Sequence, residues 1–221
     1  MHRFLQLQRR RYRIIFLEQD NERLFNRAKL LNSAMRELCL NGSVPQFPKF
    51  NPYSALRFES FECFVFHDID KLPKNKEIAY WCGPEPTQLV RAKLGVERKT
   101  MGEQPDVYYS KFMGGVTIFN RWNLILVNGA SNNFRGWGGE DDDLYARLRL
   151  SGISVNRLPD EVGVYLTQEH RDDMNINSNK DYLLKRSLVI ERLLTDGFAQ
   201  VNYNLVNFIE FPLYTVLKLD V

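Results

Sequence analysis

Residues 133–144 read Asn133-Phe134-Arg135-Gly136-Trp137-Gly138-Gly139-Glu140-Asp141-Asp142-Asp143-Leu144. Leu144, Tyr145 and Leu148 then follow at the spacing of one helix face, so we expect a helix over residues 141–150. The N-terminus of a helix favours negative charge, which explains one or two of the acids as a cap. Four adjacent carboxylates repel one another, and the glycines make the backbone costly to order. The pattern therefore favours a functional site over a simple cap.

The size and composition of the chain indicate one globular domain. With 221 residues it can form one sizeable core but hardly two domains. Its 44% hydrophobic and 26% charged residues are ordinary for a globular protein, and a net charge of +3 gives no case for nucleic-acid binding. The sequence contains no apolar run of membrane-spanning length and no signal-peptide core at its start. Because Met1-His2-Arg3-Phe4 resembles the interior of a domain, we expect an excised catalytic region.

Strand-like and helix-like segments alternate along the chain, which favours an α/β fold. Apolar runs predict strands, the first two of them buried, at 12–17, 63–66, 108–119, 154–157, 162–166 and 208–219, the last an edge strand because of Pro212. Helical periodicity predicts helices at 23–39 and 181–194 as well as at 141–150. Residues 42–54 are expected to form a loop, and residues 77–106 a surface excursion.

Two acids follow the second expected strand, in His67-Asp68-Ile69-Asp70. Side chains alternate in an extended chain, so Asp68 and Asp70 point to one side. Ligands of open α/β sheets bind beyond the carboxyl ends of strands, and paired carboxylates there can hold a divalent cation. A turn stabilised by Asx hydrogen bonds is the alternative, and the triplet alone does not decide between them.

A paired glycine interrupts the aromatic segment Phe112-Met113-Gly114-Gly115-Val116. Such a pair marks either a bulge or the close approach of a ligand or another backbone, and both interpretations stay open. The three cysteines, Cys39, Cys63 and Cys82, cannot be paired by arithmetic, and buried thiols in a cytosolic protein are the simplest interpretation. The sequon Asn41-Gly42-Ser43 is a weak indication of a secretory route.

Taken together, these segments resemble the β-1,4-galactosyltransferase family, which are inverting glycosyltransferases that use UDP-sugars. The resemblance runs from about Phe4 to Val221. It is carried, in order, by Phe25-Asn26-Arg27-Ala28-Lys29-Leu30-Leu31-Asn32, Phe64-Val65-Phe66-His67-Asp68-Ile69-Asp70, Gly114-Gly115-Val116 and Gly136-Trp137-Gly138-Gly139-Glu140-Asp141-Asp142-Asp143. It implies an α/β fold of the GT-A-like kind, with a mixed, mostly parallel open sheet flanked by helices. Residues 1–221 would form a single catalytic domain without the family's N-terminal uridine-binding strand and without a membrane anchor.

The resemblance also implies roles for individual residues. Asp141 would be the catalytic base, with Glu140 beside it, and Asp142 and Trp137 would contact the acceptor. Asp70 and His170 would hold Mn²⁺ or another divalent cation. The donor would be bound by Phe25, Arg27, Asp68, Ile69, Phe112, Gly115 and Trp137.

Cys63 and Cys82 match a disulfide of the family, which makes the oxidising Golgi lumen a more suitable setting than the cytosol. The full-length form would then be a type II membrane glycoprotein, in contact with the membrane only through an anchor outside this chain. Its expected partners are a UDP-sugar donor and a glycan acceptor on a glycoprotein or glycolipid, and no nucleic acid.

Three positions depart from the family pattern. Arg135 stands where the family has an aromatic residue before the Gly-Trp pair, and Thr167 stands where it has a methionine ligand. Phe112 is bulky, which disfavours an N-acetyl group on the donor, so we expect UDP-galactose and keep UDP-N-acetylgalactosamine as the alternative. A homologue that binds sugar or nucleotide without turnover, and a metal-dependent hydrolase, are the competing hypotheses.

Overall fold

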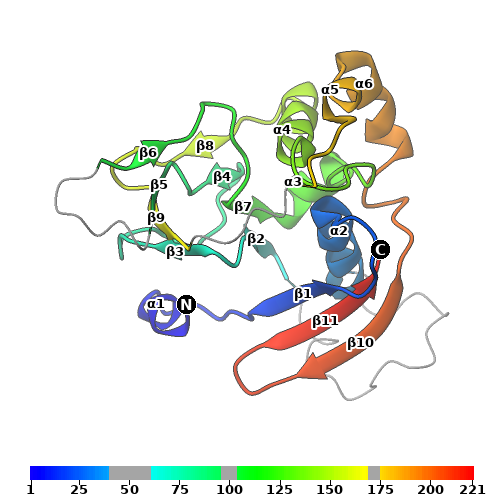
Figure 1. Ribbon diagram of the computed structural model, residues 1–221. Helices are drawn as coiled ribbons and strands as arrows, with labels where there is room; N and C mark the ends of the chain where they lie inside the picture. Colours follow the sequence, from blue (N-terminus) through cyan, green and yellow to red (C-terminus); the bar gives the residue numbers. More distant parts are fainter. Residues whose placement is uncertain (40–60, 96–103, 169–174) are drawn as a thin grey trace.

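The computed structural model describes residues 1–39, 61–95, 104–168 and 175–221 (Figure 1). Its helices are α1 (His2–Leu7), α2 (Arg27–Cys39), α3 (Arg121–Leu126), α4 (Glu140–Leu150), α5 (Lys180–Leu183) and α6 (Arg186–Thr195). Its strands are β1 (Ile15–Gln19), β2 (Cys63–His67), β3 (Lys71–Pro73), β4 (Thr87–Gln88), β5 (Ala92–Gly95), β6 (Asp106–Val107), β7 (Val116–Asn120), β8 (Asn156–Arg157), β9 (Val164–Thr167), β10 (Asn204–Glu210) and β11 (Thr215–Asp220). None of the helices in these ranges combines the length and the apolar character that crossing a bilayer needs.

The strands form three sheets, ordered β1-β11-β10, β2-β7-β4-β8 and β3-β9-β5-β6. Helices flank these sheets, as an α/β protein requires (Figure 1). Parallel pairing joins β1 to β11, β4 to β8 and β5 to β9, whereas the other strand pairs of the described residues are antiparallel. The expected mixed α/β class is therefore confirmed, but the expected mostly parallel single sheet is wrong. An apolar run does not reveal the direction in which a strand pairs, and among the described antiparallel pairs only the hairpin β10–β11 has a tight turn that dictates it.

Helix α2 lies between two cores and so connects the sheets. Ala28 and Met35 pack against β2, β7 and α4 in one buried cluster. Leu30 and Ala34, on another face of the helix, pack against β11 in a second cluster. Apolar residues on two faces make α2 a central element, and its first residue is Arg27.

Two expectations about burial are wrong. Strand β1 begins at Ile15 rather than at residue 12, and its Phe16 is 39% exposed. Within the described part of the chain, β1 is an edge strand that pairs with β11 alone, and it is not buried on both faces. Conversely, the segment 77–106 is more than a surface excursion, because Leu89 and Val90 are buried and the segment supplies β4 and β5.

Two expectations about boundaries also need correction. The helix expected over 181–194 is divided into α5 and α6. At the break, the carbonyl of Leu183 accepts from Arg192 Nη2 at 2.6 Å instead of from a backbone N–H of a continuing helix. The closing strand expected over 208–219 is the hairpin β10–β11, whose turn contains Pro212 and is closed by Phe211 N–H donating to Tyr214 O at 2.8 Å. Proline has no N–H to donate and suits this turn.

Candidate active site

The turn after β2 joins three elements through Asp68. Arg27, at the start of α2, contacts Asp68 Oδ1 with Nε at 2.9 Å and Nη2 at 2.8 Å. Gly115 N–H, just before β7, donates to Asp68 Oδ2 at 3.1 Å, and Asp68 N–H donates to Gly115 O at 2.8 Å. One carboxylate therefore fixes the start of α2, the end of β2 and the glycine pair relative to one another.

The start of α4 approaches the same place. Burial opposes the charge of Arg27 and lowers its pKa, but Asp68, Glu140 and Asp141 outweigh burial, so that the pKa is raised. A methyl group at Gly114 would lie 3.0 Å from Asp141 Oδ2 and 2.9 Å from the Phe112 ring. Glycine is thus required for the close approach of Asp141 to the backbone before β7. The structure thus brings together Arg27, Asp68 and Asp141, which come from separate sequence motifs.

The surroundings of Asp141 disfavour its ionised form. Burial, followed by repulsion from Glu140 and Asp142, raises the pKa of Asp141 from 3.8 to about 6, although Arg27 opposes the shift. A carboxylate with a raised pKa is a better proton acceptor near neutral pH. Glu140 Oε2 is buried and has no hydrogen-bond partner among the described residues.

Aromatic side chains line the space beside these acids. Phe112 stacks on Tyr108, with ring centroids 4.1 Å apart, and meets Tyr109 edge-on at 5.6 Å. Tyr109 Oη donates to Asp142 Oδ1 at 2.9 Å, and its ring is half exposed. Burial raises the pKa of Tyr108 to about 12, with further contributions from Asp70 and Asp68. Flat ring faces beside carboxylates are suited to a sugar, which presents both apolar and hydroxyl surfaces.

The loop before α4 carries Trp137, which is 67% exposed. Backbone contacts on both sides hold the loop, since Gly136 N–H donates to Phe25 O and Trp137 N–H donates to Asn175 O, each at 2.8 Å. The ring of Phe25 is also exposed. Gly139 is the N-cap that precedes helix α4; it has φ 94° and lies against the Phe134 ring, where a methyl group would be 2.8 Å from a ring carbon. Glycine is required at this junction.

The expected metal ligands are only partly described, because His170 lies outside the described residues. Asp70 is in a protected position: Lys71 Nζ donates to its Oδ2 at 2.6 Å, and Gln168 N–H of the segment after β9 donates to its carbonyl at 3.1 Å. On β9, Thr167 Oγ1 is buried without a hydrogen-bond partner in the part of the chain that the structure describes. A carboxylate and an unsatisfied hydroxyl are oxygen donors of the kind that hard divalent cations take. Within the described residues, however, no three His, Cys, Asp or Glu side chains gather as a metal site.

Two further expected features concern Ile69 and the cysteine pair. Ile69 is 82% exposed between the two acids. Cys63 and Cys82 form a disulfide, with Cα atoms 5.5 Å apart, and this pairing is confirmed.

A buried ion network that sequence reasoning missed supports α4 from behind. Asp143 Oδ2 accepts from Arg147 Nε at 2.7 Å, and its Oδ1 accepts from Arg192 Nη2 of α6 at 2.6 Å. Asp196 accepts from Asn132 N–H at 3.0 Å and contacts Arg147 Nη2 at 3.7 Å, so the network also holds the base of the Trp137 loop. The i,i+4 spacing of Asp143 and Arg147 was a signal for one of these pairs.

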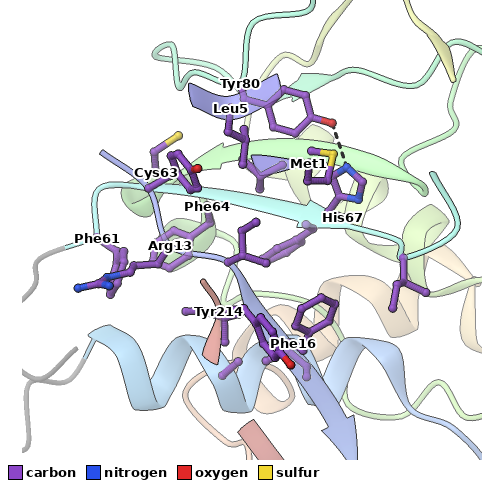
Figure 2. A pocket seen from close by; sticks show the side chains of 18 of the residues that line it. Met1, Leu5, Arg13, Phe16, Phe61, Cys63, Phe64, His67, Tyr80 and Tyr214 are labelled. Atoms are coloured by element: carbon purple, nitrogen blue, oxygen red, sulfur yellow. Dashed lines mark hydrogen bonds between the residues drawn. The ribbon is translucent and has the colours of Figure 1, made fainter. Parts of the chain in front are cut away.

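The structure also has a groove that is lined by none of Arg27, Asp68 and Asp141. This groove of about 1680 Å³ lies between β1 and β2 and is lined mainly by apolar side chains from these strands, α1 and α2 (Figure 2). Figure 2 shows Phe16 and Tyr214 facing Phe64 across it, with His67 and Tyr80 hydrogen-bonded at its edge, 2.9 Å apart. Among the described strands, β1 and β2 are edge strands of their sheets, so the groove separates two strand edges that no other described strand pairs with.

Comparison with known proteins places these features in context. A family profile described as the N-terminal domain of galactosyltransferase matches residues 96–171. β-1,4-Galactosyltransferase 4 of Mus musculus is 37% identical over 222 residues, which cover 100% of this chain and 57% of that protein. β-1,4-Galactosyltransferase 1 of Bos taurus is 31% identical over 223 residues, which cover 100% of this chain and 49% of that protein. The chain thus spans about half the length of the curated relatives it matches.

Solved structures agree on the fold. The catalytic domain of Drosophila β-1,4-galactosyltransferase 7, in complex with xylobiose, superposes with a TM-score of 0.73 at 22% identity, covering 100% of this chain and 85% of that chain. A mutant of the same enzyme in complex with manganese, UDP-Gal and xylobiose gives a TM-score of 0.72. The fold is therefore the GT-A-like fold expected from the motifs, and the resemblance to the β-1,4-galactosyltransferases is confirmed by the 31–37% identical relatives that match the chain over its whole length.

Proposed function

Because this chain is a relative of the β-1,4-galactosyltransferases over its whole length, we propose that it transfers galactose from UDP-galactose to a terminal sugar hydroxyl. The transfer inverts the anomeric centre and forms a β-1,4 linkage to an N-acetylglucosamine-like acceptor. The observation that carries the proposal is the close approach of Asp141 to Gly114, beside the Arg27–Asp68 pair. A proton acceptor, Asp141, and a positively charged group, Arg27, therefore lie next to each other.

In this proposal Asp141 removes the proton of the attacking hydroxyl, and its raised pKa supports that role. Asp142 and Tyr109 orient the acceptor, with the 2.9 Å hydrogen bond between them fixing the carboxylate. Glu140 lies beside the base. Attack from the face opposite the leaving group gives inversion, so the leaving diphosphate must lie away from α4.

The donor would be held by the groups around the Asp68 turn. Arg27 provides a positive charge, Phe25 and Ile69 provide exposed apolar surface, and Gly115 lets the donor approach the backbone. Trp137, which is exposed on its loop, would cover the sugar and exclude water, since water would hydrolyse the donor.

A divalent cation such as Mn²⁺ would be held by Asp70 and His170, with the Thr167 hydroxyl as a further oxygen donor. When bound, it would neutralise the charge that develops on the departing diphosphate. The orphaned Thr167 hydroxyl supports this assignment.

Phe112 favours galactose over N-acetylgalactosamine. Its ring is held between Tyr108 and Tyr109 and lies against Gly114, which leaves little freedom to make room for an acetamido group. Replacing Phe112 with Ile should therefore raise turnover with UDP-N-acetylgalactosamine relative to UDP-galactose. No change in this ratio would remove Phe112 from the donor site.

We also propose that residues 1–221 form one catalytic domain that accepts a further strand between β1 and β2. The two unpaired strand edges along the 1680 Å³ groove support this, since an added strand would join the two sheets. The disulfide supports a luminal Golgi location, and a type II anchor would belong to the longer protein.

The direct test measures UDP release from UDP-galactose with Mn²⁺ and a panel of sugar acceptors, followed by NMR assignment of the product linkage. Asp141→Asn should lower kcat at least 100-fold, whereas Asp160→Asn, which changes a half-exposed carboxylate paired with Arg91, should leave it unchanged. Absence of transfer by folded protein, or equal rates for wild type and Asp141→Asn, would refute the proposal.

The second candidate function is sugar or nucleotide binding without turnover. Lys71 favours it, because this ammonium already neutralises the acid expected to hold the metal. Calorimetry that detects UDP or glycan binding by a protein without transferase activity would support this alternative.

A further inference from the structure

Both acids of the Asp68-Ile69-Asp70 turn are paired with a cation of the chain itself. Asp68 contacts Arg27 at 2.8 Å, and Asp70 Oδ2 contacts Lys71 Nζ at 2.6 Å. The second pair is the more protected, since the Lys71 and Asp70 side chains are 9% and 14% exposed. A charge-assisted contact this short in a protected position is strong and geometrically defined.

The position of Lys71 follows from the fold. Its backbone N–H closes the turn by donating to Asp68 O at 3.1 Å, and its Cα pairs with Thr167 across β3 and β9. Backbone contacts within the turn and with β9 therefore fix the position of Lys71 next to Asp70. Lysine is rarely buried without a partner, and Asp70 supplies that partner here.

The pair has a consequence for metal binding, if the proposed function is correct in assigning the metal to Asp70. An ammonium on Oδ2 occupies one of the two carboxylate oxygens and repels a second cation. Thr167 adds a neutral oxygen and no negative charge to offset this repulsion. A divalent cation would have to displace Lys71 or share Asp70 with it.

We propose that Lys71 competes with the divalent cation for Asp70 and thereby sets the metal affinity of the site. Without metal, the ammonium balances the charge of the carboxylate. With metal, the ammonium must leave Oδ2 or share the carboxylate, and the affinity is lowered by the lost contact or by the repulsion between the two cations. A lysine with a purely structural role would stabilise the turn and have no effect on metal affinity.

The two roles can be separated with Lys71→Met, which keeps an unbranched apolar side chain in the buried position and removes the charge. The matched control is Lys74→Met, because Lys74 is exposed three residues further along the same segment. Titration calorimetry with MnCl₂, in the absence and presence of UDP, gives Kd for wild type and both variants. The shift of Tm caused by saturating Mn²⁺ gives a second readout that does not depend on turnover.

We expect Lys71→Met to lower the Kd for Mn²⁺ at least 10-fold and to enlarge the Mn²⁺-dependent rise in Tm, whereas Lys74→Met stays within twofold of wild type. When Asp70→Asn is added to both the wild type and Lys71→Met, the difference in their Kd for Mn²⁺ should disappear. If Lys71→Met does not fold without metal, Lys71→Gln, which keeps a donor for Asp70 without the charge, should change Kd in the same direction. Equal Kd values for wild type and the folded Lys71 variants, or no Mn²⁺ binding by any of them, would overturn the proposal.

The assay separates this inference from the proposed function. A protein that transfers no galactose but shows the expected Kd difference would refute the proposed function alone. A protein that transfers galactose with a metal affinity independent of Lys71 would refute the inference alone.

Discussion

Replacing Asp141 with Asn should remove activity and at the same time stabilise the protein above pH 6. In the folded protein, burial and the neighbouring Glu140 and Asp142 raise the pKa of Asp141 from 3.8 to about 6. Folding therefore favours the protonated acid, and the contribution of Asp141 to stability is lost as the pH rises from 3.8 through 6. Asn resembles the protonated acid at every pH and keeps an oxygen that can accept from Asp142 N–H, which donates to Asp141 Oδ1 at 3.1 Å.

The size of the effect follows from the two pKa values. Each pH unit between them corresponds to about 1.4 kcal/mol, so the gap from 3.8 to about 6 sets an upper limit of about 3 kcal/mol. Because the Asp141 residue is only partly buried by surface area, water reduces this value, and we expect about 2 kcal/mol. Urea unfolding of wild type and Asp141→Asn at pH 8 and at pH 4 measures it.

At pH 8 the variant should have the larger free energy of unfolding, and at pH 4 the difference should largely vanish. Glu161→Gln, at an exposed position, should stay within about 0.5 kcal/mol of wild type at both pH values. A variant that is no more stable than wild type at pH 8, or equally stabilised at pH 4, would show that Asp141 is not held in an unfavourable charged state. The assignment of Asp141 as a tuned base would then lose its physical basis.

Three further predictions concern the same site and its support. Activity should rise with pH and level off above about 6 as Asp141 loses its proton, and a kcat profile that is flat between pH 5 and 8 would contradict this. Gly114→Ala should lower kcat about 10-fold or more because its methyl group would meet Asp141 Oδ2 at 3.0 Å, whereas Gly83→Ala, which meets nothing within 4 Å, should leave kcat unchanged. Cys63→Ser should reduce the free energy of unfolding by about 3 kcal/mol, since the bond to Cys82 closes a loop with a sequence separation of 19, and denaturant unfolding without reductant checks this value.

Elements with strong local periodicity could be predicted from the sequence, whereas the sheet pairing could not. Helices α2 and α4 and strand β2 lie close to their expected ranges because apolar spacing or an apolar run defines each of them. Strands β4, β6 and β8 have two residues each, too few to produce a pattern. Their pairing depends on partners far away in the sequence, such as Thr87 of β4 beside Asn156 of β8.

The site could be predicted in part. The motif residues Arg27, Asp68, Gly115 and Asp141 do come together, because each lies at the end of an element that packs on the shared core. The Lys71–Asp70 pair could not be foreseen, since neighbouring residues in an extended chain point to opposite sides and only the turn before β3 brings them into contact. The Tyr108-Tyr109 doublet before Phe112 was a visible signal that sequence reasoning did not use.

The run of four acids is best explained by the rotation of a helix. Successive side chains of α4 point in directions about 100° apart, so each acid meets a different neighbour. Asp141 approaches Gly114, Asp142 accepts from Tyr109, and Asp143 is buried between two arginines. Asp141 and Glu140 repel each other, which alone would favour unwinding the first turn.

The ion pairs of Asp143 with Arg147 and Arg192 oppose that unwinding, because breaking them would leave buried charges without partners. The first turn of α4 can therefore hold the buried Asp141 on one side while the ion pairs of Asp143 stabilise the turn from the other side. An apolar residue in place of Asp143 would remove the anchor and leave two buried arginines without this partner. Asp143, the fourth acid, is thus explained by its buried ion pairs, and it is needed neither as a helix cap nor for contact with a substrate.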